Sequence, residues 1–169
     1  MGRNRKTSKA AGTRLETQME RWLQWAFQDK RIRRNRLHGH KDHGDIGGLY
    51  YSMDEVCIEC KSTANSDSGA PLNVRHEFEQ ALTEADNIDS PWPVLIKKRD
   101  GVTDRDWRKG GDQLGIIRRT DWLLLRKNCA TPLLPQSLVA LPRNPRLIGM
   151  PCTELFILFN HGLPLGPED

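Results

Sequence analysis

An alternation of helix-like and strand-like segments constrains the fold of this chain most. Apolar residues recur at helical spacing from Leu15 to Phe27, which predicts a helix that begins at Thr13. Two strand-like segments follow at 45–51 and 55–61, and residues 52–54 between them are typical of a hairpin connection. The first 60 residues therefore predict one helix that leads into a pair of strands.

Later segments continue this alternation. A loop rich in Ser, Asn, Asp and Gly spans residues 62–71, and apolar residues at helical spacing follow it. The expected elements after this loop are a helix with Val74, Phe78, Ala81, Leu82 and Ala85 on one face, strands at 94–96 and 114–117, and a short helix capped by Thr120 and Asp121.

The two ends of the chain differ in composition from its centre. Residues 1–11 lack apolar periodicity, so we expect a disordered basic arm there and a folded domain over 12–129. From Ala130 onward proline recurs every few residues, and about 40 residues rarely build an independent core. We therefore expect a proline-rich C-terminal extension over 130–169, whose apolar segment 155–159 is covered by the domain or by a partner subunit.

Charge is distributed unevenly along the 169 residues, although the formal net charge is only +4. Residues 1–41 hold twelve Lys or Arg and three Asp or Glu, a local net of +9, whereas residues 42–169 have a net of −5. This asymmetry indicates a segment that binds a polyanion, followed by an acidic region where a catalytic or metal site could lie. A solvated basic tail and a charged helix face are the alternative.

The sequence predicts neither a membrane protein nor a secreted protein. No run approaches the roughly 18 apolar residues that cross a bilayer, and the basic N-terminus leads into no apolar segment of a signal peptide. The four cysteines are too sparse and too uneven for a disulfide framework. We expect an intracellular, cytoplasmic protein.

Asp45, Glu59 and Lys61 form the candidate chemical site. Side chains two apart on a strand share a face, so Glu59 and Lys61 project to one side, about 6.5 Å apart along the strand. If Asp45 ends its own strand alongside, the two carboxylates can share one Mg²⁺ ion. Lys61 could then orient or deprotonate the attacking water, and the cation would stabilise charge on a scissile phosphate.

This pattern resembles the PD-(D/E)XK nuclease superfamily, and within it the archaeal-type Holliday-junction resolvases and the phage proteins similar to them. The matching motifs are Gly12-Thr13-Arg14-Leu15-Glu16, Asp45-Ile46, and Val56-Cys57-Ile58-Glu59-Cys60-Lys61-Ser62-Thr63. The resemblance covers roughly residues 10–126. If the chain is phage-encoded, its compartment would be the host cytoplasm.

The resemblance implies an α/β fold with a restriction-endonuclease-like core, in which helices flank a central mixed β-sheet. It also implies magnesium-dependent hydrolysis of phosphodiester bonds, with Mn²⁺ as a substitute, by a homodimer that acts on branched or duplex DNA. The metal ligands would be Asp45, Glu59 and the backbone carbonyl of Cys60. Lys61 would be the water-positioning base, and Glu16 an accessory catalytic carboxylate.

Two assignments have competitors in the sequence. The family's proline before the aspartate is Gly44 here, and Asp42 competes with Asp45, which the following Ile46 favours. Glu20 competes with Glu16, but Glu16 lies closer to the apolar stripe at about 100° per residue, and a carboxylate there needs a partner. A capping box with Thr13 is the other interpretation of Glu16.

The basic run after the first helix supplies candidate DNA contacts, because Arg and Lys side chains bind phosphates. A solvated charged face is the alternative. Nothing in this run reads base edges, so we expect recognition of backbone and shape. The candidate DNA-binding residues are Lys30, Arg31, Arg33, Arg34, Arg36, His40 and Lys41.

Other metal and redox sites fit the sequence less well. His38, His40 and His43 lie close together, but no further ligand stands at the spacing of a zinc site, and a His-metal finger remains an alternative. Cys57 and Cys60 have the spacing of a redox motif in a strand context, where such motifs do not occur. The leading hypothesis is therefore a structure-selective endonuclease, a Holliday-junction resolvase. The alternatives are a restriction or repair nuclease of the same fold and a non-catalytic DNA-binding protein.

Overall fold

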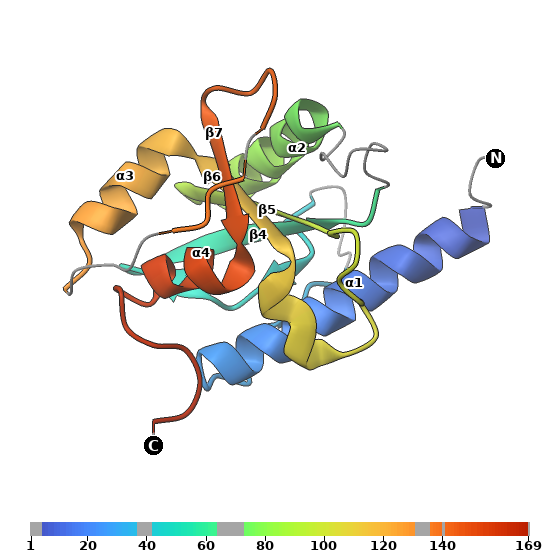
Figure 1. The fold of residues 1–169 in the computed structure, drawn as a ribbon, viewed down its shortest axis with the longest axis horizontal. Helices are drawn as coiled ribbons and strands as arrows, with labels where there is room; N and C mark the ends of the chain where they lie inside the picture. The colour runs from blue at the N-terminus through green and yellow to red at the C-terminus, as the bar shows by residue number, and fades with distance from the viewer. Residues whose placement is uncertain (1–4, 37–41, 64–72, 131–135, 140, 169) are drawn as a thin grey trace.

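The computed structural model describes residues 5–36, 42–63, 73–130, 136–139 and 141–168 as helices flanking a mixed sheet (Figure 1). The helices are α1 (Arg5–Ala26), α2 (Val74–Asn87), α3 (Arg119–Lys127) and α4 (Cys152–Phe159), with a 3-10 helix η1 (Trp107–Asp112). The strands are β1 (Arg33–Arg34), β2 (Ile46–Gly47), β3 (Tyr50–Tyr51), β4 (Asp54–Lys61), β5 (Trp92–Lys97), β6 (Leu114–Arg118) and β7 (Leu147–Pro151).

The sheet has seven strands in the order β1-β2-β4-β5-β6-β7, and β3 pairs with β4 beside this path. Strands β4 and β5 run parallel, whereas the other pairs are antiparallel. The connection between β4 and β5 contains α2, as parallel neighbours require a long crossover. The expected α/β fold with a central mixed sheet flanked by helices is confirmed.

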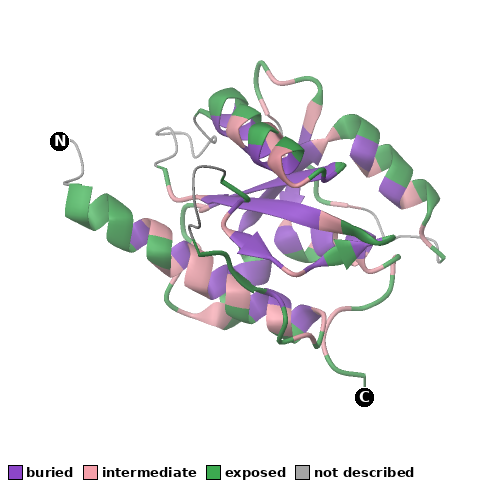
Figure 2. Ribbon diagram, turned by 180° about the vertical axis from the view of Figure 1, so that it is seen from behind, coloured by how far each residue is buried: buried purple, intermediate pink, exposed green. Residues whose placement is uncertain are grey.

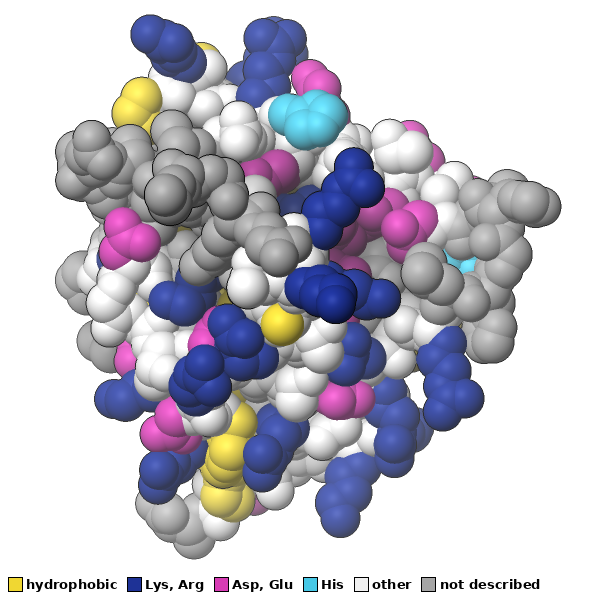
Figure 3. Space-filling model, turned by 90° about the vertical axis from the view of Figure 1, so that its right-hand side faces the viewer, with side chains coloured by type: hydrophobic (Ala, Val, Ile, Leu, Met, Phe, Trp, Pro, Cys, Tyr) yellow, Lys and Arg dark blue, Asp and Glu magenta, His cyan; other side chains and the backbone are white. Residues whose placement is uncertain are grey.

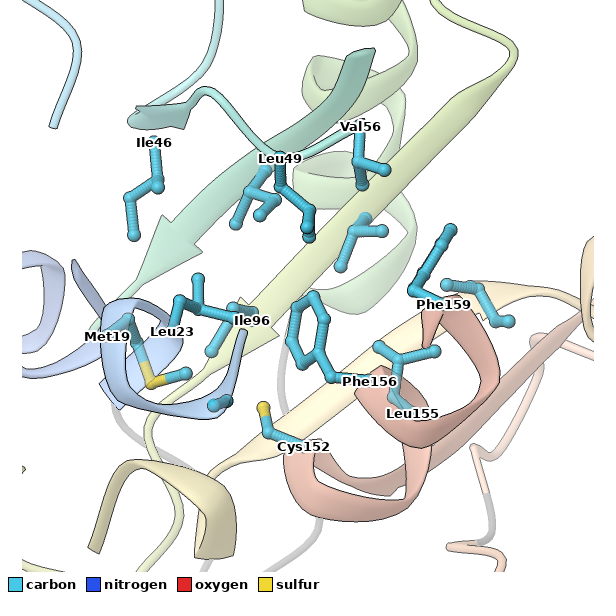
Figure 4. Packing of buried hydrophobic residues seen from close by; sticks show 14 of the residues in the cluster. Met19, Leu23, Ile46, Leu49, Val56, Ile96, Cys152, Leu155, Phe156 and Phe159 are labelled. Atoms are coloured by element: carbon cyan, nitrogen blue, oxygen red, sulfur yellow. The ribbon is translucent and has the colours of Figure 1, made fainter. Parts of the chain in front are cut away.

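The two faces of the sheet are covered differently, and alternation along β4 decides which side chains meet which helix. Val56, Ile58 and Cys60 belong to the large core cluster that α1 and α4 cover. Figure 4 shows Phe156 and Leu155 of α4 packed with the buried side chains of that cluster. The intervening residues Glu59 and Lys61 therefore face the other side, where α2 packs.

Helix α1 is longer than the sequence predicts. It begins at Arg5 and not at Thr13, so the expected disordered arm is wrong for residues 5–11, while residues 1–4 lie outside the described part. Adding residues to an existing helix gains one hydrogen bond for each residue fixed, so a docked helix readily extends. Thr13 lies inside the helix, where its carbonyl accepts from Oγ1 of Thr17 at 2.8 Å, so the capping box is also wrong.

The predicted hairpin is present between β3 and β4. Its turn residues Ser52 and Met53 both have positive φ, 49° and 74°, as tight hairpin turns with right-handed twist require. The strand expected over 45–51 is divided into β2 and β3 at Gly48, where φ is 89°. A Cβ there would lie 2.4 Å from the carbonyl oxygen of Arg31, so only glycine fits this bend.

The predicted elements after residue 73 are found at their expected places: α2, β5, β6 and α3. The expected cap of α3 is wrong, because Arg118 is the N-cap residue and Thr120 and Asp121 lie in the first turn. Asp121 instead accepts from Nε of Arg118 at 2.7 Å. Most of the loop expected at 62–71 lies outside the described residues.

The C-terminal region belongs to the domain, so the expected boundary between residues 129 and 130 is wrong. Strand β7 pairs with β6, and α4 buries Leu155 and Phe156 completely. The ring of Phe156 lies 5.8 Å from that of Trp22 on α1, which shows that the domain itself covers the apolar segment. None of the described helices is long and apolar enough to cross a membrane.

Candidate active site

Strand β4 presents Glu59 and Lys61 side by side, as alternation predicts. Nζ of Lys61 lies 2.8 Å from Oε1 of Glu59. Glu59 is only 4% exposed, while the side chain of Lys61 remains 28% exposed. A buried carboxylate is thus paired with an ammonium group that still reaches solvent.

Asp45 directly precedes β2 and is held against β4. Its N–H donates to the carbonyl of Ile58 at 2.8 Å, and its Oδ2 accepts from the N–H of Cys60 at 2.7 Å. N–H and C=O of one residue point to the same side of an extended strand, so the Cys60 carbonyl also faces the Asp45 side. The structure therefore brings together the carboxyls of Asp45 and Glu59, which lie within hydrogen-bonding reach of one another.

Gly44 explains how Asp45 reaches this position. Its φ is 82°, and a Cβ would lie 2.9 Å from the carbonyl oxygen of Ile58. Proline cannot adopt a positive φ, so the family's proline could not replace this glycine in the bend seen here. Asp42, the competing aspartate, lines the same cleft, but its charge acts on Glu84 of α2.

Glu84 is a further acid of the site, buried like Glu59, that the sequence analysis missed. It is 7% exposed, and its carboxyl lies within hydrogen-bonding reach of Glu59. Among the described residues, Oε2 of Glu84 is buried without a hydrogen-bond donor. A signal was present, because Glu77 and Glu84 are seven residues apart and lie together along one edge of the apolar face of the predicted helix.

Glu77 lies at the other end of the same helix face and pairs with a buried lysine. Nζ of Lys97 donates to both carboxylate oxygens of Glu77, at 2.8 and 3.0 Å, and to Oγ1 of Thr63 at 2.6 Å. Lys97 is fully buried and stands opposite Lys61 in the register of β4 and β5. This ion pair fixes α2 to the strand ends directly beyond the candidate site.

Burial, and then the nearness of other carboxyls, raises the pKa values of Asp45 and Glu59. Burial, and then the charge of Glu59, raise the pKa of Asp45 to about 8, while the N–H of Cys60 acts in the opposite direction. Burial and the Glu84 carboxyl raise the pKa of Glu59 to about 8 against the effect of Lys61. The site therefore holds protons near neutral pH, and a cation would displace them on binding.

Glu16 lies near these acids and has the partner that its position requires. Its Oε2 lies 2.7 Å from Nη2 of Arg34, and its charge contributes to the raised pKa of Asp45. The competing Glu20 accepts from the backbone N–H of Arg34 at 3.0 Å. Both glutamates thus fasten β1 to α1, and Glu16 is the one near Asp45.

Glu16, Asp45, Glu59 and Lys61 line one cleft of about 900 Å³. On the face shown in Figure 3, Lys and Arg side chains lie beside a recess that contains Asp and Glu side chains. The residues that line the cleft are Lys9, Gly12, Thr13, Glu16, Glu20, Arg33, Arg34, Asn35, Arg36, Asp42, His43, Gly44, Asp45, Glu59 and Lys61.

The predicted DNA-binding residues divide into groups in the structure. Arg33, Arg34 and Arg36 line the cleft, although the guanidinium of Arg34 is bound to Glu16. Arg31 pairs with Asp29 at 2.9 Å, and neither it nor the exposed Lys30 lines the cleft. His40 and Lys41 lie outside the described residues, as does His38 of the histidine cluster.

The donor set suits a hard divalent cation. Mg²⁺ is commonly held by one or two carboxylates and retained waters, and the facing carboxyls of Asp45 and Glu59 match this requirement. Within the described ranges, no three Asp, Glu, His or Cys side chains are grouped so that they could hold a metal ion. Cys57 and Cys60 are buried free thiols, and burial raises the pKa of both.

Comparison with known proteins adds no identification. No protein-family model, no curated protein and no solved structure matches this chain.

Proposed function

We propose that this chain is a magnesium-dependent DNA endonuclease with a restriction-endonuclease-like core. The observation that carries the proposal is the position of Asp45, Glu59 and Lys61 on the floor of a cleft whose walls bear Lys9 and arginines. Basic walls attract DNA, but buried carboxylates repel its phosphates. A divalent cation between the carboxylates and a phosphate reconciles the two, and such a cation is what phosphodiester hydrolysis needs.

Asp45 and Glu59 would hold the cation, together with the backbone carbonyl of Cys60, and Mn²⁺ would substitute for Mg²⁺. Magnesium would neutralise the carboxylates and stabilise the negative charge that builds up on the scissile phosphate. Lys61 would hold the attacking water by hydrogen bonds from Nζ and assist its deprotonation. Glu16 would add a carboxylate near the reacting groups, where Arg34 holds it in place.

Branched DNA is the substrate that we propose, with a Holliday junction as the leading candidate and a homodimer as the active form. A junction has paired strands to cut, and a two-fold dimer supplies two sites related by the same symmetry. The resemblance of the motifs around Glu16, Asp45 and Glu59 supports this choice. The cytoplasm, or the host cytoplasm for a phage protein, is the compartment consistent with such a substrate.

A cleavage assay tests the proposal. Purified protein is incubated with a labelled four-way junction and with matched linear duplex, in Mg²⁺, in Mn²⁺ and in EDTA. The variants are Glu59→Ala and Lys61→Ala, with Lys127→Ala as a control because Lys127 is exposed at the end of α3. We expect cation-dependent cleavage of the junction by wild type and by the control, and losses of about 100-fold or more in the two site variants.

Other outcomes would change the assignment. Equal cleavage of junction and duplex would favour a restriction or repair nuclease of the same fold. Binding without cleavage under every condition would favour a non-catalytic DNA-binding protein. Cleavage that persists in EDTA, or in both site variants, would contradict the proposed mechanism.

A further inference from the structure

The side of α1 that carries Glu16 continues beyond the candidate site as a basic ridge. At about 100° per residue, Arg5, Lys9, Gly12, Thr13, Glu16 and Glu20 fall within an arc of about 100° on the helix. All of these except Arg5 line the cleft. One side of a single helix therefore leads from the acidic floor of the cleft to the basic N-terminal turns.

These N-terminal turns project from the body of the protein. Residues 5–10 are all exposed, and the first buried residue of α1 is Ala11. Figure 2 shows the exposed turns extending past the edge of the sheet. At about 1.5 Å per residue, Lys9 lies about 10 Å and Arg5 about 16 Å from Glu16 along the helix axis.

Gly12 in the middle of this ridge is not explained by packing within the protein. It lies inside α1, where glycine is one of the least favourable residues. Apart from its chain neighbours and the backbone of its own helix, a Cβ at this position would have no described heavy atom within 4 Å, so packing against the rest of the described protein does not demand the glycine. Because Gly12 lines the cleft, the missing side chain leaves the helix surface open to whatever occupies the cleft.

The charge of the ridge suits an extended polyanion, because its cations follow one another along the helix. Over Arg5 to Leu15, α1 has basic residues and no acidic ones. Arg14 is on another side and pairs with Asp104 at 3.3 Å, and Lys6 falls just outside the arc, so Arg5 and Lys9 are the cations of the ridge. A ridge of about 16 Å spans roughly five nucleotides of one DNA strand, at about 3.4 Å per nucleotide.

We propose that this ridge, defined by Arg5, Lys9, Gly12 and Thr13, guides the backbone of one DNA strand away from the scissile phosphate. The strand lies closest to the helix at Gly12, where no side chain obstructs it. Lys9 and Arg5 then bind phosphates successively further from the site. This path rests on the proposed function in one respect, that DNA is the ligand. It adds a DNA-contact surface outside the basic run from Lys30 to Lys41.

Two variants test the path in binding assays performed in EDTA, so that cleavage does not interfere. Fluorescence anisotropy with labelled four-way junction and duplex DNA is recorded at several salt concentrations for wild type, Arg5→Ala/Lys9→Ala, Gly12→Ala and the control Lys127→Ala. The double variant is expected to weaken binding at least tenfold and to lower the slope of log K against log salt by about 2.

Gly12→Ala separates a DNA contact from a structural role, because thermal stability and DNA affinity are expected to change in opposite directions. Alanine favours the helix, so the melting temperature is expected to rise, while the added methyl group weakens DNA binding severalfold. Unchanged affinity in Gly12→Ala, or an unchanged salt slope in the double variant, would overturn the path.

The outcomes distinguish this path from the proposed function. If wild type cleaves DNA in Mg²⁺ but both variants bind normally, the path is wrong and the nuclease assignment stands. If the variants weaken binding as expected but wild type never cleaves, the path stands and the nuclease assignment fails. If wild type neither binds DNA in EDTA nor cleaves it in Mg²⁺, both are contradicted.

Discussion

The carboxyl group of Glu84 on α2 lies within hydrogen-bonding reach of that of Glu59 on β4. Burial raises the pKa of Glu59 most, and the contact with Glu84 raises it further. Two acids from different elements thus share one buried space on the α2 face of the sheet. Helix α2, which covers β4 in this way, helps to determine how the Glu59 carboxyl is oriented.

Replacing Glu84 tests this orientation. Glu84→Gln keeps the shape and can donate an N–H to Glu59, so we expect DNA cleavage within about threefold of wild type. Glu84→Ala removes the contact and leaves a cavity beside Glu59, so we expect cleavage to fall about tenfold or more. Glu79→Gln is the control, since Glu79 is an exposed carboxylate of the same helix. Equal cleavage by the Gln and Ala variants would contradict a positioning role.

Asp45→Asn is expected to stabilise the cation-free protein while it removes a metal ligand. The folded pKa of Asp45 is about 8, far above its unfolded value of about 3.9. The proton bound in the folded state stabilises it fully below about pH 4, and this contribution is lost as the pH rises through 8. Asparagine carries no charge to desolvate, so the free energy of unfolding should exceed that of wild type by an amount that grows between pH 5 and 9.

Urea unfolding in EDTA across this pH range measures the difference. We expect on the order of 1–3 kcal/mol in favour of Asp45→Asn at pH 9 and little at pH 4. Asp54→Asn, at an exposed position, should show no comparable trend. A difference that shrinks as the pH rises would show that the charge of Asp45 is compensated in the folded protein.

The buried pair of Lys97 and Glu77 is expected to stabilise the fold only as a pair. Lys97→Met leaves a buried carboxylate without its cation and should cost about 3–5 kcal/mol. The double variant Lys97→Met/Glu77→Leu removes both charges and should recover much of that loss. Urea unfolding of four proteins, namely wild type, Lys97→Met, Glu77→Leu and the double variant, measures the coupling, and strictly additive effects would contradict it.

Gly44→Ala should displace Asp45 and reduce cleavage. The added Cβ would lie 2.9 Å from the Ile58 carbonyl, and φ is 82°, so both a clash and backbone strain result. Gly101→Ala is a matched control, because Gly101 has φ 75° but open space around its Cβ position. We expect a loss of about 1 kcal/mol of stability from strain alone at Gly101, with cleavage unchanged. Equal effects on cleavage would show that the bend at Gly44 is not needed to position Asp45.

The sequence predicts the centre of the site because alternation along one strand is local. Glu59 and Lys61 share a face whatever the rest of the fold does, and the hydrophobic Ile46 correctly indicated the strand beside Asp45. Glu84 was missed because the helix pattern shows a buried glutamate position without showing which sheet face the helix covers. That information is in the tertiary structure alone.

The remaining differences between the sequence predictions and the structure also arise from contacts between residues far apart in the sequence. The sequence analysis did not predict β7 and α4, because the region after Ala130 is rich in proline. Strand β7 forms by pairing with β6, and α4 packs beside α1. No local sequence pattern shows these long-range contacts. Arg34 was predicted as a DNA contact from its basic neighbours, but Glu16, eighteen residues earlier, binds its guanidinium. A charge run therefore shows where cations gather and not which of them remain available for a ligand.

Single-turnover cleavage of a labelled four-way junction in Mg²⁺ by wild type and by Asp45→Asn tests the central claim most directly. Since Asp45→Asn should be at least as stable as wild type near pH 8, any loss of rate reflects the site and not the fold. We expect the rate constant to fall by about 100-fold or more. A rate within about threefold of wild type would contradict the assignment of Asp45 and Glu59 as the carboxylates that hold the catalytic cation.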